Sequence, residues 1–307
     1  MKLAIVFLMM GLLLFGCIGQ PATAPAGDTT PESEDAAQEV IHVPTDSDEP
    51  ETPATEPEET EPAETEPETE NPPSEPAAEE EEGQSEDIVY KTKDSWDIHG
   101  TLHYAPGTDK PETLIILAHG YGQDRSAFDP LIPVLKERLS DMDVLAIDMR
   151  GHGESTNIGT YEHFIAGDFI AMQNDIAGAI PHMEMIRPSI ERYYIVGASI
   201  GSSAALNYAV DDASVHKVVM LSPGLDYRGV KIEKANWDYI HALYLATANG
   251  DSYSRDSANT LYADSPSDNK QLKIYDEIGN AHGTDMFAAT ANTMEPLTEL
   301  VGIWLQE

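Results

Sequence analysis

One short stretch near the middle of the chain restricts the fold more than any other. Residues 193–196 are β-prone, and residues 202–209 are small and typical of a helix. Between them stands Gly197-Ala198-Ser199-Ile200-Gly201, a Gly-x-Ser-x-Gly pattern. A serine at a sharp strand-to-helix turn takes up a strained backbone, and the flanking glycines let neighbouring chain approach where a Cβ would clash. The pattern therefore predicts a serine hydroxyl presented at a sheet edge, with the Ile200 amide and a helix N-terminus beneath it.

The rest of residues 88–307 alternates apolar runs with helical patterns, as a mostly parallel sheet with helices on both faces requires. The first two strands alternate and predict an antiparallel pair, whereas residues 113–118 form a continuous apolar run that predicts a strand covered on both faces. Helices are expected at 126–139, at 164–186, which Pro181 either kinks or divides, and at 285–305. The eight expected strands are 88–90, 96–104, 113–118, 144–147, 193–196, 218–221, 242–246 and 272–275.

Three further segments follow expected strands directly, as the serine turn does. His119-Gly120-Tyr121-Gly122 follows the third strand, Ala248-Asn249-Gly250-Asp251 comes off the seventh, and Asn280-Ala281-His282-Gly283 follows the eighth. Of the ten histidines, His282 is the one that lies after the last strand with a glycine behind it and a closing helix beyond. The sequence therefore predicts that these segments converge with Ser199 at one rim of the sheet.

This set of motifs resembles the α/β-hydrolase superfamily over nearly all of residues 88–307. The resemblance implies Ser199 as nucleophile, Asp251 as the acid and His282 as the general base, with the amides of Tyr121 and Ile200 as the oxyanion hole. The chain order serine, acid, histidine is that of the superfamily. Ala248 replaces the usual first glycine of the acid turn, so Asp256 remains the alternative acid.

Two other features of the resemblance concern loops. Asp148-Met149-Arg150-Gly151-His152-Gly153-Glu154-Ser155 is similar to a loop found in many members, and ion pairing is expected to pin it, with Asp148 and Arg150 structural rather than catalytic. His119 is also expected to be structural. Only about twenty residues separate the sixth and seventh strands, which leaves no room for a large cap domain. Trp237 and Tyr239 in this connection are expected either to line the site or to pack.

The chain begins with a different kind of segment. Residues 1–17 comprise Met1-Lys2, an apolar run and Gly16-Cys17, a pattern typical of a secretory signal. Leu14-Phe15-Gly16-Cys17 resembles a prokaryotic lipoprotein processing box, which implies a lipid on Cys17, the single cysteine of the chain. The alternative is an uncleaved apolar anchor. Either interpretation predicts an extracytoplasmic protein attached to a membrane.

Residues 18–87 are rich in Pro, Glu, Thr, Ala and Ser, with 24 acidic residues and no Lys or Arg. Such a segment has too little apolar surface to offset the entropy of ordering, so a disordered stalk is expected. Removing these 24 acidic residues and Lys2 from the formal net charge of −38 leaves −15 for residues 88–307. An acidic surface repels nucleic acid and anionic lipid head groups, which excludes both as expected ligands.

Together these features predict an extracytoplasmic serine hydrolase that cleaves carboxylic esters of small or medium size through an acyl-enzyme, without metal or cofactor. A peptidase or acyltransferase of the same fold remains an alternative, because the fold does not fix the substrate. A non-catalytic binding lipoprotein is the alternative from another functional class. The oligomeric state is left open.

Overall fold

Residues 84–307 are described by the computed structural model. The expected signal segment 1–17 with Cys17, and the expected stalk up to residue 83, lie outside the described residues. The expected stalk boundary at residue 87 is wrong by three residues, because Ser85, Glu86 and Asp87 already belong to the first strand. They pair with the second strand, and the Thr101 hydroxyl donates to Asp87 at 2.7 Å, so edge pairing orders this polar sequence.

Eight strands form one sheet in the order β1-β2-β4-β3-β5-β6-β9-β10. The expected opening pair is confirmed: β1 is antiparallel to β2, and β2 is antiparallel to β4. Every other neighbouring pair is parallel, from β4 across to β10. The strands are β1 (Ser85–Lys91), β2 (Asp97–His103), β3 (Thr113–Ala118), β4 (Met142–Ile147), β5 (Arg192–Ala198), β6 (Val215–Leu221), β9 (Ala242–Ala248) and β10 (Lys270–Tyr275).

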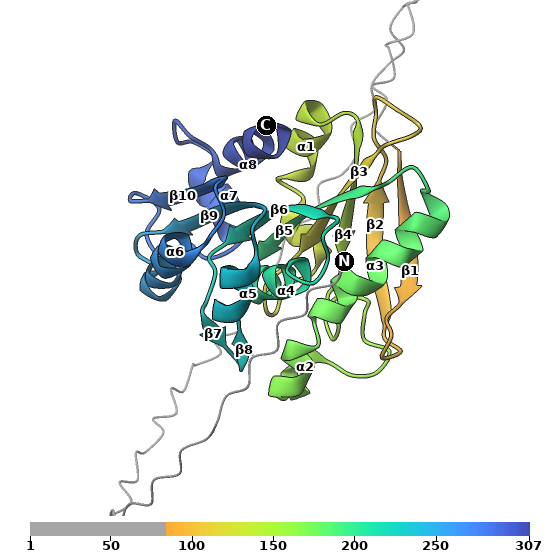
Figure 1. Ribbon diagram of the computed structural model, residues 1–307, viewed down its shortest axis with the longest axis horizontal. Coiled ribbons are helices and arrows are strands. Elements are labelled where there is room, and N and C mark those ends of the chain that lie inside the picture. Colours follow the sequence, from red (N-terminus) through yellow and green to blue (C-terminus); the bar gives the residue numbers. More distant parts are fainter. Residues whose placement is uncertain (1–83) are drawn as a thin grey trace, which may run out of the picture. The chain divides into compact units, whose positions relative to one another are not determined.

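Two hydrophobic cores cover the two faces of this sheet, and β3 shows how they are separated. Leu114 and Ile116 belong to one core, whereas Ile115 and Leu117 belong to the other, because successive strand side chains point to opposite faces. The first core includes side chains of α2 to α6, and the second those of α1, α7 and α8. Figure 1 shows α1 and α8 on one side of the sheet and α3 and α4 on the other. The helices are α1 (Ile132–Arg138), α2 (Ala166–Ile170), α3 (Gln173–Ile186), α4 (Ile200–Ala209), α5 (Glu233–Asp238), α6 (Ser252–Asp264), α7 (Asp285–Thr290) and α8 (Leu297–Gln306).

The three expected long helices are each divided. Residues 126–139 form a 3₁₀ turn (Arg125–Phe128) followed by α1, because Pro130 has no N–H to bond back to Ser126, whose carbonyl instead accepts from Asp129. The 164–186 segment breaks before α3 rather than at Pro181, which stays inside that helix. At the break, the amides of Met172 and Asp175 bond three residues back instead of four.

The closing segment 285–305 divides into α7 and α8 at Pro296, which stands at the N-cap of α8. The Thr290 hydroxyl accepts from the Leu297 amide at 2.9 Å and so satisfies one amide of the new helix.

The connection between β6 and β9 holds no large cap. It contains a short hairpin, β7 (Asp226–Tyr227) and β8 (Val230–Lys231), and then α5. A short 3₁₀ turn (Tyr161–His163) completes the elements. Within residues 84–307, no helix combines the length and apolar character that a bilayer crossing needs.

Candidate active site

Ser199 occupies the turn between β5 and α4, as the sequence predicts. Its φ of 51° and ψ of −120° lie outside the conformations that a residue with a side chain normally adopts. A Cβ on Gly197 would stand 2.5 Å from the Ser202 Cα, and one on Gly201 would stand 2.3 Å from the Ala118 carbonyl oxygen. Both glycines are therefore required by close backbone approach, which confirms the reason for the Gly-x-Ser-x-Gly pattern.

The structure brings the three predicted side chains, Ser199, His282 and Asp251, into one hydrogen-bonded row, the serine row. The Ser199 Oγ lies 2.8 Å from His282 Nε2, and His282 Nδ1 lies 2.6 Å from Asp251 Oδ2. The His282 side chain is 45% exposed and that of Asp251 14%, so the acid is shielded while the imidazole remains accessible. Asp256, the alternative acid, pairs instead with Arg255 at the surface.

Each member of this row is also held by its own surroundings. Asp251 caps α6 by accepting from the Ser254 amide at 3.3 Å, which fixes one carboxylate oxygen while the other faces the imidazole. Gly250 lets this turn approach the histidine loop, because a Cβ there would stand 2.2 Å from the Gly279 carbonyl oxygen. The carboxylate is thus placed to set the tautomer and orientation of His282.

Two polar side chains that the sequence analysis did not single out hold the histidine loop. The buried Ser222 hydroxyl accepts from the Gly283 amide at 2.9 Å. Gln123 accepts from the Gly120 amide at 3.1 Å and donates to the Thr284 hydroxyl at 2.9 Å. Ser222 directly follows β6, so the rule that strand ends meet at one rim could have identified it.

The two predicted oxyanion donors lie on the segments that flank Ser199. Gly120 is close enough that a Cβ on it would stand 3.3 Å from the Ser199 Cβ, which places the Tyr121 loop beside the serine. Ile200 is the first residue of α4. Among residues 84–307, neither the Tyr121 amide nor the Ile200 amide donates to another group. Both donors are therefore available to a substrate oxygen.

His119 lies beneath this loop and is fully buried. Its Nε2 accepts from the Met149 amide at 2.9 Å, so Nδ1 carries the proton and donates to the Gly120 carbonyl at 2.7 Å. Burial lowers the pKa of His119 to about 3, against the raising effect of the Gly120 carbonyl. The ring is therefore a neutral structural element, as expected, and not a base.

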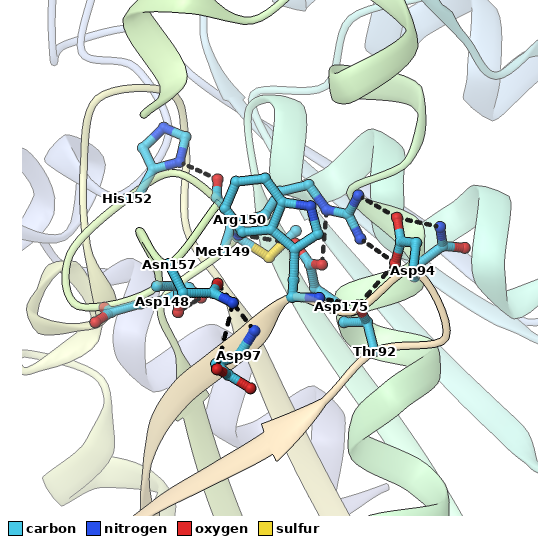
Figure 2. Close-up of polar contacts among 12 residues, drawn as sticks. Thr92, Asp94, Asp97, Asp148, Met149, Arg150, His152, Asn157 and Asp175 are labelled. Carbon is cyan, nitrogen blue, oxygen red and sulfur yellow. Dashed lines mark hydrogen bonds and ion pairs between the residues drawn. The ribbon is translucent and has the colours of Figure 1, made fainter. Parts of the chain in front are cut away.

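The loop after β4 is pinned by ion pairs, and these pairs contain no member of the serine row. Asp148 accepts from the Arg125 guanidinium at 2.6 Å. Figure 2 shows the Arg150 guanidinium between Asp94 and Asp175, at 2.7 Å and 2.8 Å respectively. Burial raises the pKa of Asp175 to about 7, an effect that Arg150 opposes. The predicted structural role of Asp148 and Arg150 agrees with these contacts.

Comparisons with known proteins add to this geometry. The family described as serine aminopeptidase, S33, matches residues 109–248, just under half of the chain. Over 112 residues the chain is 26% identical to a Schizosaccharomyces pombe protein whose name proposes a monoglyceride lipase. That alignment covers 36% of this chain and 28% of the yeast protein, so the chain spans less than a third of this relative.

Solved structures match over a larger share. An esterase from Pyrococcus furiosus has a TM-score of 0.60 at 19% identity and covers 73% of this chain and 91% of its own. The esterase from Exiguobacterium antarcticum has a TM-score of 0.56 at 12% identity, covering 71% and 99%. A protein from Coxiella burnetii described as an alpha-beta serine hydrolase homologue has a TM-score of 0.55 at 14% identity, covering 71% and 96%.

This is the α/β-hydrolase fold. The eight-stranded, mostly parallel sheet with helices on both faces and no large cap is thereby confirmed. The family match and the yeast relative further support a hydrolase of the α/β-hydrolase superfamily.

A small cavity of about 100 Å³ opens beside the serine row. Trp237 and Tyr239 do not line it: Trp237 is exposed, and the buried Tyr239 hydroxyl donates to the Val215 carbonyl at 3.4 Å. A larger open groove of about 450 Å³ borders β10 and residues 292–295, and it contains none of the three row residues. The small cavity is lined by Ser199, Ile200, Ser203, Ser222, Gly224, Tyr227, Tyr253, Ser254 and His282.

Within residues 84–307, no three His, Cys, Asp or Glu side chains are grouped so that they could hold a metal ion. The groups that meet beside the cavity are a hydroxyl, an imidazole, a carboxylate and two backbone amides.

Proposed function

We propose that the chain is a serine hydrolase that cleaves carboxylic esters of small acyl groups through an acyl-enzyme on Ser199. The observation that carries the proposal is the continuous row from Ser199 Oγ through His282 to Asp251, with contacts of 2.8 Å and 2.6 Å. A hydroxyl is a weak nucleophile by itself, and a neighbouring imidazole held by a carboxylate is the usual means of activating it.

The reaction proceeds in two halves. His282 Nε2 accepts the Ser199 proton while Oγ attacks the ester carbonyl, and the negative charge that develops on the carbonyl oxygen is stabilised by the Tyr121 and Ile200 amides. His282 then returns the proton to the leaving alcohol as the C–O bond breaks. In the second half water attacks the acyl-enzyme with His282 as base, which releases the acid and restores the serine.

The cavity favours a short acyl group. Its volume of about 100 Å³ is well below the roughly 300 Å³ at which drug-sized ligand pockets begin. No cap domain stands over it in the described part of the chain, so the remainder of a substrate can extend into solvent.

A peptidase is the second candidate, because the matching family is named for serine aminopeptidases. An aminopeptidase has to bind the ammonium group of its substrate, for which a carboxylate is the natural partner. None of the nine lining residues is Asp or Glu. This composition favours an ester over an unblocked peptide.

We further propose that the hydrolase acts outside the cytoplasm, attached to a membrane through lipid on Cys17. The support is the Leu14-Phe15-Gly16-Cys17 pattern after an apolar run. Changing Cys17→Ser is expected to move the protein from the membrane to the soluble fraction after cell fractionation. Retention in the membrane would instead favour an uncleaved apolar anchor.

Labelling with a fluorophosphonate probe tests the mechanism. Wild type is expected to gain one probe mass on Ser199, Ser199→Ala none, and His282→Ala far less per unit time. Ser203→Ala is the matched control, because Ser203 lines the same cavity but makes only a 3.5 Å contact with a backbone carbonyl. A folded wild type that takes no label would point to the non-catalytic binding protein.

A substrate panel separates the two enzyme classes. Nitrophenyl esters of two, four, eight and twelve carbons are compared with aminoacyl nitroanilides. Highest kcat/KM on the short esters is expected. Cleavage of the amides without cleavage of any ester would overturn the proposed esterase.

A further inference from the structure

Residues with a strained, positive-φ backbone occur in the proposed site and in a hairpin turn close to it. Among residues 84–307, four residues other than glycine have a positive φ: Ser95, Ser199, Ser222 and Arg228. Ser199 and Ser222 belong to the site. Arg228 (φ 52°) and Gly229 (φ 85°) form the two-residue turn of the β7–β8 hairpin, a position where Asn-Gly is usual and a long side chain is not. Residues that keep a strained backbone near a site often have a functional role, so Arg228 is a candidate for one.

The hairpin that carries Arg228 is fixed from two sides. The Tyr253 hydroxyl, from α6, accepts from the Asp226 amide at 3.0 Å and lies 2.7 Å from the Asp226 carbonyl oxygen. On the other side a Cβ on Gly229 would stand 2.9 Å from the Ala166 Cβ at the start of α2. Figure 1 shows β7 and β8 beside α5, at the same end of the molecule as α2. The turn is therefore held in place, and the position of Arg228 follows from the fold.

The Arg228 side chain bridges the hairpin and the oxyanion loop. Its guanidinium carbon lies 3.9 Å from the centre of the Tyr121 ring and 5.0 Å from that of Phe169. Its Nε donates to the Tyr227 hydroxyl at 3.2 Å. Tyr227 lines the cavity beside Ser199, and Tyr121 is the residue whose amide is a proposed oxyanion donor. The cation thus contacts a side chain that lines the cavity and is stacked on the aromatic ring of Tyr121, which holds it there.

Charge pairing sets Arg228 apart from the other arginines. Arg125, Arg138, Arg150, Arg187, Arg192 and Arg255 each have a carboxylate within 4.0 Å. Among the side chains that the structure describes, no carboxylate lies within 4.0 Å of the Arg228 guanidinium. Residues 88–307 carry a formal charge of −15, so this guanidinium differs from the other arginines although acidic residues are abundant in the domain.

We propose that Arg228 is a specificity-determining residue that binds a carboxylate carried by the ester substrate. A guanidinium presents a planar set of donors that matches a carboxylate, and the acidic surface elsewhere would repel an anionic substrate. The proposal rests on the proposed ester hydrolysis and adds the substrate class: esters with a free carboxylate on either the acyl or the alcohol side.

Two matched pairs of esters test the proposal with the full chain in detergent. Phenyl acetate and 3-acetoxybenzoate differ by a carboxylate on the leaving group, and methyl butanoate and monomethyl succinate differ by one on the acyl group. For at least one pair, Arg228→Gln is expected to lower kcat/KM on the anionic ester about fivefold more than on the neutral ester. Arg228→Lys is expected to restore only part of this difference, because the ammonium keeps the charge but not the planar donor set. Raising NaCl from 0.05 to 0.5 M is expected to reduce the difference in wild type.

Arg192→Gln is the control, because Arg192 is an exposed arginine paired with Glu112 at the start of β5. Arg192→Gln is expected to leave the ratio of kcat/KM on the anionic ester to that on the neutral ester unchanged in both pairs. Equal losses on the charged and neutral member of both pairs in Arg228→Gln would show that Arg228 only packs against Tyr121, and would overturn the inference.

Probe labelling separates this failure from failure of the proposed function. Fluorophosphonate labelling of Ser199 with ester turnover but no dependence on charge would overturn the role of Arg228 alone. A folded chain that takes no label and hydrolyses none of the four esters would overturn both.

Discussion

Acid sensitivity of stability follows from the burial of His119. The unfolded chain binds a proton on this histidine at its ordinary pKa of about 6.5, whereas burial lowers the pKa in the folded state to about 3. Between these values the unfolded state holds one more proton than the folded state, so the free energy of unfolding falls as pH falls. This loss of stability caused by His119 is absent above about pH 7. The loss of stability reaches about 2 kcal/mol at pH 5 and about 4 kcal/mol at pH 3.

The hydrogen bonds of His119 independently predict that protonation of its ring destabilises the folded state. Nε2 accepts from the Met149 amide at 2.9 Å, and a protonated ring would set a second donor against that amide. The side chain is 0% exposed, so water cannot relieve the conflict.

Urea unfolding followed by tryptophan fluorescence at pH 7.5 and pH 5.0 measures the effect. His119→Gln cannot titrate, so its loss of stability between the two values is expected to be about 2 kcal/mol smaller than that of wild type. His163→Gln, at an exposed histidine whose ring is solvated in both states, is the matched control and is expected to behave as wild type. Equal losses in wild type and His119→Gln would refute the reasoning.

Three other substitutions test the site and its supports. Gly201→Ala places a Cβ 2.3 Å from a backbone carbonyl at the end of the neighbouring strand. The free energy of unfolding should therefore fall by about 1–3 kcal/mol, and esterase activity should fall strongly. A wild-type free energy of unfolding and wild-type activity in this variant would contradict the close approach. Ser222→Ala removes the acceptor of a buried amide and should destabilise the histidine loop by about 1–3 kcal/mol and lower kcat more than Ser203→Ala does. Asp175→Asn removes a partner of buried Arg150 and should cost about 3–5 kcal/mol at pH 8 by urea unfolding. Because burial raises the folded-state pKa of Asp175 to about 7, wild type takes up a proton on folding at pH 5.5 and is relatively more stable there, so the cost of the substitution is expected to be larger at pH 5.5 than at pH 8.

The sheet and the serine row could be predicted because they depend on local signals. Each of Ser199, Asp251 and His282 lies after a strand of the parallel part of the sheet, and the carboxyl ends of parallel strands share one rim. The same signals predicted the required glycines beside Ser199. The roles of these side chains in catalysis stay predictions until the labelling is done.

The helix boundaries could not be predicted in the same way. The break before α3 lies where Asp175 turns toward Arg150, a contact between residues 25 positions apart. The break before α8 depends on the Thr290 hydroxyl replacing a helical bond seven residues away. Hydrophobic periodicity does not mark the first break, whereas Pro296 at the N-cap of α8 is a local signal for the second.

The β7–β8 hairpin escaped prediction for another reason. Each of its strands has two residues, which is too short for an alternating pattern to be recognised. Its turn carries Arg-Gly rather than a usual hairpin pair. The proposed role of Arg228 therefore could not be predicted from the sequence, because it depends on the contacts with Tyr121 and Tyr227 in the folded chain.

The positive φ values at Ser199 and Ser222 have a consequence for anyone engineering this molecule. Glycine would relax the backbone at both places, so a library sorted by heat resistance alone would enrich chains without a nucleophile or without the hydroxyl that holds the histidine loop. Selection for durability and selection for turnover therefore pull these two positions in opposite directions, and a useful screen must score both together.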